Sequence, residues 1–228
     1  KVTPINRGTL VVFPDEGKAR LAWRFSVHAL GAEWLVWVDA ITGFVLSAQA
    51  ESWTVDGWVF ESGPLDGQVM EAKLPVVDSS TRLDGWNVWS TRCTDWTIDP
   101  RPFGVRVCHD WMQSAKADPQ GDFFAVPDEG SLRDPFAEVN AFYHSERIAQ
   151  WFSDRFGLRL PQMQIFTGFP LTNAFYGDFN EDGDRDLSFG VTDDGFNFAY
   201  DSDVVMHEFG HAIVRELSGS LSTRADHL

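Results

Sequence analysis

Polar and apolar residues alternate along residues 20–28, RLAWRFSVH, in the pattern of a β-strand. One face takes Leu21, Trp23, Phe25 and Val27, and the other takes Ala22, Arg24, Ser26 and His28. Because successive strand side chains point to opposite faces of a sheet, this alternation predicts a half-buried strand. Residues 33–49 contain two apolar runs separated by Asp39–Gly43. They predict a hairpin, since Gly43 can take the positive φ that such turns need.

Residues 51–126 show no sustained helical period. They are rich in Gly, Pro, Trp and Val, with turn signals at Gly63-Pro64, Asp66-Gly67 and Asp84-Gly85. This composition predicts short strands with irregular connections. We identify no chemical motif in the segment.

A long helix is predicted over residues 134–157. Asp134 is a good N-cap, Pro135 suits the first helical position, Glu138 complements the helix dipole and Gly157 closes the C-terminus. Apolar residues at helical spacing form one broad face: Phe136, Val139, Phe142, Tyr143, Ala149, Phe152 and Phe156. His144 falls within this face, which favours a structural role for it over metal binding.

The rest of the chain mixes strands with one more helix. Residues 162–190 contain two strand-like runs, MQIF and TNAFYG, followed by an acidic hairpin, and residues 203–217 have the apolar periodicity of a buried helix. Helices and strands occur together without strict alternation, so the predicted fold class is α+β.

Composition bounds the classes of function. A hydrophobic fraction of 43% in 228 residues indicates a folded globular protein, and the net charge of −16 argues against nucleic acid or an anionic membrane as a partner. No apolar run approaches the roughly 18 residues of a membrane span, and from the sequence pattern we expect no signal peptide within these residues. The chain begins in the middle of a pattern, so we expect it to be an excerpt of a longer precursor.

Residues 201–217, DSDVVMHEFGHAIVREL, contain the spacing H-E-x-x-H. Positions four apart on a helix project from one face, so His207 and His211 are candidate zinc ligands. Glu208 lies one step round the helix, where it can act as a general base toward a water molecule. The alternative is a core helix with a hydrogen-bonded histidine pair, but random placement gives this motif with a probability of only about 1%.

The acidic segment 178–189, DFNEDGDRDLSF, has the spacing that begins an EF-hand calcium loop. Its candidate calcium ligands are Asp178, Asn180, Asp182 and Asp186. The twelfth position, however, holds Phe189 where a bidentate glutamate is needed, and strands flank the loop instead of helices. An exposed hairpin tip without calcium is therefore the alternative.

Several stretches together resemble the thermolysin-like gluzincins, and more closely the secreted fungalysin-type peptidases and their bacterial relatives. These stretches are FAEVNAFYHSERI, NAFYG at 173–177 and DVVMHEFGHAIV at 203–214, preceded by an L-A-W-R strand and a V-D-A-x-T-G hairpin similar to the PepSY module of propeptides. The resemblance implies a partial propeptide in residues 1–50 and the N-terminal part of a catalytic domain in residues 51–228.

The resemblance also implies roles for single residues. His207 and His211 match zinc ligands, Glu208 matches the catalytic glutamate, and Asn173 and Ala174 match positions that hold an extended polypeptide substrate. It further implies secretion, in which case Cys93 and Cys108 plausibly form a disulfide; in a cytosolic protein they would be two buried thiols. The propeptide would be a partner of the catalytic domain, and segment 47–52 is the expected processing junction.

The departures from the family concern the third zinc ligand. Gluzincins take it from a later glutamate, and this chain has no glutamate after Glu216, so we expect the ligand beyond Leu228. Asp226 and His227 are the remaining late candidates. A metzincin pattern fails because Ile213 and Leu217 stand where it needs glycine and histidine. We therefore expect these 228 residues to be inactive alone, the other reading being a non-catalytic module that acts as a propeptide-like inhibitor or binds calcium.

Overall fold

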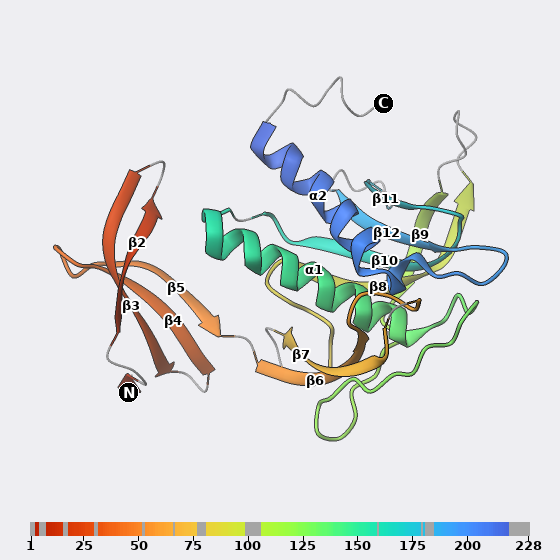
Figure 1. Cartoon of the computed structure of the whole chain (residues 1–228), viewed down its shortest axis with the longest axis horizontal. Coiled ribbons are helices and arrows are strands. Elements are labelled where there is room, and N and C mark those ends of the chain that lie inside the picture. Colours follow the sequence, from red (N-terminus) through yellow and green to blue (C-terminus); the bar gives the residue numbers. More distant parts are fainter. Residues whose placement is uncertain are drawn as a thin grey trace.

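The computed structural model shows a mixed α+β fold. It describes residues 3–4, 8–15, 18–29, 32–51, 53–65, 67–76, 81–98, 106–158, 160–178, 180 and 185–218. Among these residues the strands form two five-stranded sheets and a two-stranded one, accompanied by two α-helices. Figure 1 shows the N-terminal sheet on one side of the helices and the other sheets. None of the helices described is long and apolar enough to cross a membrane.

The N-terminal sheet is antiparallel. It contains β1 (Thr3–Pro4), β2 (Thr9–Asp15), β3 (Lys18–Ala29), β4 (Ala32–Asp39) and β5 (Val45–Glu51). The predicted hairpin between β4 and β5 is confirmed. The Asp39 carboxylate accepts the backbone N–H groups of Ile41 and Thr42, which holds its pKa at about 2, and Gly43 has a φ of 73°. The expected processing junction at 47–52 falls largely within β5, which is paired with β4 and is not an open linker.

The predicted strand at residues 20–28 is part of β3, but the prediction of its buried face was wrong. Leu21 and Trp23 are 47% and 40% exposed, whereas Ala22 between them is fully buried. Their cross-strand partners in β2, Val12 and Leu10, are exposed as well. The two core clusters of the described chain contain none of these four residues. Among the described residues, this apolar sheet face is therefore without the packed layer that its alternation led us to expect.

The central sheet has the strand order β11-β12-β10-β8-β9. Its strands are β8 (Val88–Ile98), β9 (Arg106–Met112), β10 (Met163–Pro170), β11 (Ala174–Gly177) and β12 (Asp186–Val191). Strand β10 is parallel to both β8 and β12, and it is buried over almost its whole length. The outer pairs, β8–β9 and β11–β12, are antiparallel. A separate ribbon pairs β6 (Trp53–Phe60) with β7 (Val69–Val76), so residues 51–126 are strand-rich as predicted.

The first helix has the predicted bounds. Helix α1 (Pro135–Phe156) begins after the N-cap Asp134, whose side chain accepts the N–H of Phe136, and ends at Gly157 with a φ of 67°. The second helix, α2 (Ser202–Ser218), covers the predicted segment 203–217 and follows a short 3-10 turn, η1 (Phe198–Tyr200). Figure 1 shows α1 and α2 beside each other across the central sheet.

Helix α1 carries buried carboxylates that hold other segments in place. Glu138 lies in the first turn of the helix, as predicted, and also accepts the backbone N–H groups of Ser114 and Ala115. Burial raises the pKa of Glu138 to about 8, against the opposing effect of these hydrogen bonds. Glu146 accepts the N–H groups of Asn87 and Val88, and burial raises its pKa too. Each carboxylate thus supplies an acceptor that the neighbouring backbone would otherwise lack.

The strands β8 and β9 are joined covalently. Cys93 and Cys108 form a disulfide with their Cα atoms 5.8 Å apart.

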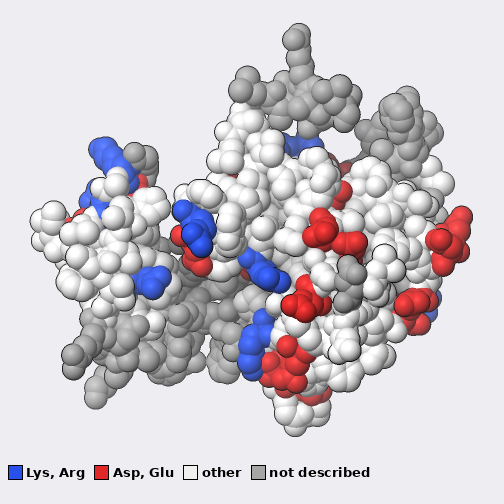
Figure 2. All heavy atoms as spheres, viewed as in Figure 1, with Lys and Arg blue, Asp and Glu red and all other residues white. Residues whose placement is uncertain are grey.

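Charged side chains are spread unevenly over the surface. On the face shown in Figure 2, Asp and Glu side chains gather over the larger part of the molecule, which accords with the net charge of −16.

Candidate metal centre

The helix that carries the two histidines is fixed at its start. The Asp201 carboxylate accepts the N–H of Asp203 at 2.9 Å and caps the helix. The Ser202 N–H donates to the carbonyl of Ser62 at 2.7 Å, which joins α2 to the segment after β6. Tyr200, in the turn before the helix, donates its hydroxyl to the buried carboxylate of Asp134. These bonds tie the first turn of α2 to β6 and to the start of α1.

Two buried side chains of α1 complete this attachment. Asn140 accepts the N–H of Phe60 at 2.8 Å and donates to the carbonyls of Ala199 and Tyr200. One turn later, His144 contacts the carbonyl of Phe60 through Nε2 at 3.0 Å. Burial lowers the pKa of His144 to about 4, so its imidazole is neutral near pH 7 and donates this bond from Nε2. His144 is therefore a structural residue, as predicted.

The candidate zinc ligands face each other. The Nε2 atoms of His207 and His211 lie 3.2 Å apart, and both side chains are exposed to solvent. In an ideal tetrahedral zinc site, two nitrogen ligands at 2.0–2.1 Å from the ion are about 3.3–3.4 Å apart. The two histidines therefore fit a zinc ion without rearrangement of the helix.

Glu208 differs from the histidines in its surroundings. It is only 7% exposed, and one of its carboxylate oxygens lies within 4.8 Å of the histidine nitrogens. Burial raises the pKa of Glu208, while His211, His207 and a backbone hydrogen bond from Tyr176 act in the opposite direction. Such a carboxylate is placed to take up a proton from a group held between it and the histidines.

Strand β11 lies against this helix at the edge of the central sheet. Tyr176 is in β11, so its bond to Glu208 links the strand to the candidate site. Ala174 is buried and pairs with Phe189 of β12, while Asn173 lies exposed just before the strand and accepts the N–H of Gly190 through its carbonyl. The predicted substrate residues thus lie at the start of the edge strand that adjoins α2, Ala174 within it and Asn173 just before it.

The structure describes the predicted calcium loop only in part. Asp178 and Asn180 follow β11, and Asp182 lies outside the described residues. Asp186 is buried at the start of β12, where its Oδ1 accepts the N–H of Gln164 at 3.0 Å. Phe189, at the twelfth position of the motif, is fully buried in the core. Asp186 thus has a structural role inside the sheet, and calcium binding by this loop stays a prediction.

No third zinc ligand is found close to the histidine pair in the described part of the chain. His207, Glu208 and His211 form the one described cluster of three metal-binding side chains, and Asp226 and His227 lie outside the described residues. Sequence reasoning missed the residues that hold α2, namely Asn140 and Tyr200. A polar Asn140 one turn before His144, on the apolar face of α1, is a signal for a structural role of Asn140 but not for its partners.

Comparisons of the chain with models of known protein families, with curated proteins and with solved structures found no match.

Proposed function

We propose that this chain contributes the zinc-binding helix and the substrate-binding edge strand of a zinc-dependent metalloendopeptidase. The observation that carries the proposal is the pair of Nε2 atoms 3.2 Å apart with the buried Glu208 between their residues. The position of α2 against an edge strand supports it, because an extended peptide can add to a sheet edge by backbone hydrogen bonds.

In this proposal His207 and His211 hold the metal and Glu208 transfers protons. Zinc, when bound, lowers the pKa of water and polarises a carbonyl group. Glu208 accepts a proton from the attacking water as its oxygen forms a bond to the peptide carbonyl carbon. It then gives the proton to the departing amide nitrogen as the C–N bond breaks. Burial raises the pKa of Glu208 above the ordinary value of a glutamate, which favours holding the proton between the two steps.

The proposal extends to the other parts of the chain. Residues 1–50 act as a propeptide module, and the polypeptide substrate lies along β11 near Asn173 and Ala174. A third ligand comes from sequence outside the described residues, in the remaining half of a thermolysin-like catalytic domain. The working environment is extracellular.

The test compares Glu208→Gln with Glu216→Gln in the longest natural form of the protein that carries this sequence. Glu216 is on the same helix but exposed, and it lies outside the metal-binding cluster. We expect Glu208→Gln to lower the rate of casein cleavage by at least about 100-fold, as for loss of a general base. Zinc content should be unchanged, and Glu216→Gln should keep full activity.

Zinc binding is measured separately on the 228-residue chain. We expect His207→Ala and His211→Ala each to weaken zinc binding, whereas His109→Ala, at an exposed position of β9, leaves it unchanged. Casein cleavage that persists undiminished in Glu208→Gln would rule out the mechanism. Zinc binding that survives loss of both histidines would rule out the site itself.

A further inference from the structure

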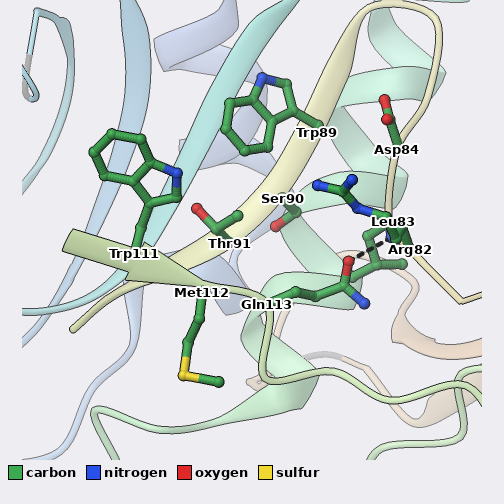
Figure 3. Close-up of a pocket in the computed structure, with 9 residues that line it drawn as sticks. All are labelled: Arg82, Leu83, Asp84, Trp89, Ser90, Thr91, Trp111, Met112 and Gln113. Atoms are coloured by element: carbon green, nitrogen blue, oxygen red, sulfur yellow. Dashed lines mark hydrogen bonds between the residues drawn. The ribbon is translucent and has the colours of Figure 1, made fainter.

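A second candidate site lies at the edge of the central sheet opposite to β11. A pocket of about 150 Å³ opens between segment 81–84, the start of β8 and the end of β9. Figure 3 shows Trp89 and Trp111 on one side of it, with the Arg82 side chain extending into the same space. A cavity of this size binds a single six-membered ring.

The pocket walls are held in place by hydrogen bonds of their own residues. Gln113 accepts the N–H of Leu83 and donates to the carbonyls of Thr81 and Ala115. The Thr91 hydroxyl donates to one carbonyl and accepts from Gln164, and Asp84 accepts from Gln162. The nearby disulfide fixes β8 against β9. The cavity is therefore a preformed one, as small-molecule sites usually are.

The donors around the pocket, in contrast, are free. Arg82 is exposed and makes no hydrogen bond or ion pair with the described residues. The indole N–H groups of Trp89 and Trp111 have no hydrogen-bond partner there either, and Figure 3 shows the N–H edge of Trp111 turned toward the pocket. Ser90 also lines the pocket, but its hydroxyl oxygen is fully buried and is therefore not among the donors that face the pocket space.

These observations define a ligand by its chemistry. Two tryptophans offer aromatic surface for a flat or ring-shaped body, and an unpaired guanidinium binds a carboxylate strongly. We propose that the pocket between Trp89 and Trp111 binds a single six-membered ring that carries a carboxylate, with Arg82 contacting the carboxylate. The ring can be aromatic or that of a uronic acid sugar. The proposal is independent of the peptidase function, because the pocket contains no residue of α2 or β11.

The experiment is a tryptophan fluorescence titration of the whole chain with benzoate and with glucuronate. Benzyl alcohol and glucose serve as the matching neutral probes. We expect at least one acid to bind saturably, and more tightly than its neutral counterpart. Arg82→Gln should weaken binding of that acid by about tenfold or more and change binding of the neutral probe by less than about threefold. Arg133→Gln, an exposed arginine in the loop before α1, is the control and should change neither.

The two acids distinguish the source of the ligand: benzoate binding supports an aromatic acid, and glucuronate binding supports a sugar acid. Trp89→Phe should reduce the fluorescence response to the bound acid, whereas Trp151→Phe, an exposed tryptophan on α1, should not. The proposal is overturned if neither acid saturates the signal at tens of millimolar. It is equally overturned if Arg82→Gln binds the acid as tightly as the natural chain does. Neither result would bear on zinc binding by α2.

Discussion

At the scale of single residues, Glu138 links stability to pH. It is fully buried on α1, and its pKa is raised to about 8 from an ordinary value of 4.5. A carboxyl whose folded pKa is raised holds its proton more firmly in the folded state than in the unfolded one. Its contribution to stability is therefore complete below pH 4.5 and is lost as the pH rises toward 8.

Glu138→Gln tests this linkage. We expect the variant to become progressively more stable relative to the natural chain as the pH rises from 4.5 to 8, by up to about 1.4 kcal/mol per pH unit. The measurement is the free energy of unfolding in urea at several pH values. Glu216→Gln, at an exposed position, should show no such trend relative to the natural chain. A constant difference between Glu138→Gln and the natural chain across this range would show that Glu138 does not titrate there.

The candidate metal ligands could be predicted from sequence because their geometry is local. His207 and His211 belong to one helical turn, so the spacing alone fixes their separation once the helix forms. The contacts of Asn140 are different in kind. They join residues 59 to 80 positions apart, and only the folded chain brings those residues together. Nothing in the local spacing of Asn140 states which backbone groups it will meet.

At the scale of elements, the junction between α1 and the N-terminal sheet depends on one glycine. Gly157 ends α1 with a φ of 67°, and a Cβ atom there would lie 2.5 Å from Cγ of Pro14 in β2. Gly43 has a similar φ of 73°, but a Cβ there would meet no atom within 4 Å. A substitution at Gly43 therefore causes backbone strain alone, whereas one at Gly157 causes backbone strain and a steric clash with β2.

We expect Gly43→Ala to lower the free energy of unfolding by about 1 kcal/mol, from backbone strain alone. Gly157→Ala should lower it by about 1–3 kcal/mol more, because the new methyl group collides with Pro14. Chemical denaturation measures both. Adding Pro14→Ala to Gly157→Ala should recover most of the extra loss. Equal effects of the two glycine substitutions would mean that β2 does not pack against the end of α1.

The bounds of a helix could be predicted where capping residues mark its ends. The buried face of a strand could not, because it depends on which other elements pack against the sheet. Asp134, Pro135 and Gly157 gave the bounds of α1 directly. The alternation around Leu21 and Trp23 identified a strand, but it could not show that this face of the sheet lies exposed. The parallel placement of β10 between β8 and β12 likewise depends on crossover connections that periodicity does not reveal.

At the scale of the whole molecule, the core clusters of the described residues contain no side chain of the N-terminal sheet. All residues of the two core clusters lie between Val55 and Ile213. In the N-terminal sheet, by contrast, several large apolar side chains remain exposed, Leu10, Val12 and Leu21 among them. Regions with few buried apolar contacts open at lower free energy than the core does.

We therefore expect native-state hydrogen exchange to separate the molecule into two units. Amides of β3 and β4 should exchange through an opening that leaves β8 and β10 protected, because the core does not use the N-terminal strands. Mass spectrometry of the exchanging full chain measures both sets of peptides. If all four strands exchanged in one cooperative opening of equal free energy, the molecule would be a single unit of stability.

The buried polar side chains of α1 also have a consequence for synthesis on the ribosome. The backbone groups of Phe60, Asn87 and Ser114 reach their native acceptors only on Asn140, Glu146 and Glu138. A growing chain exposes residues 53–115 before the ribosome has translated this helix, and the last partners, around Tyr200, come later still. The N–H groups of Phe60, Asn87 and Ser114 therefore lack these acceptors until the ribosome has made α1. The yield of folded protein should therefore depend on how fast the ribosome translates residues 115–156, and on whether chaperones bind the growing chain during that interval.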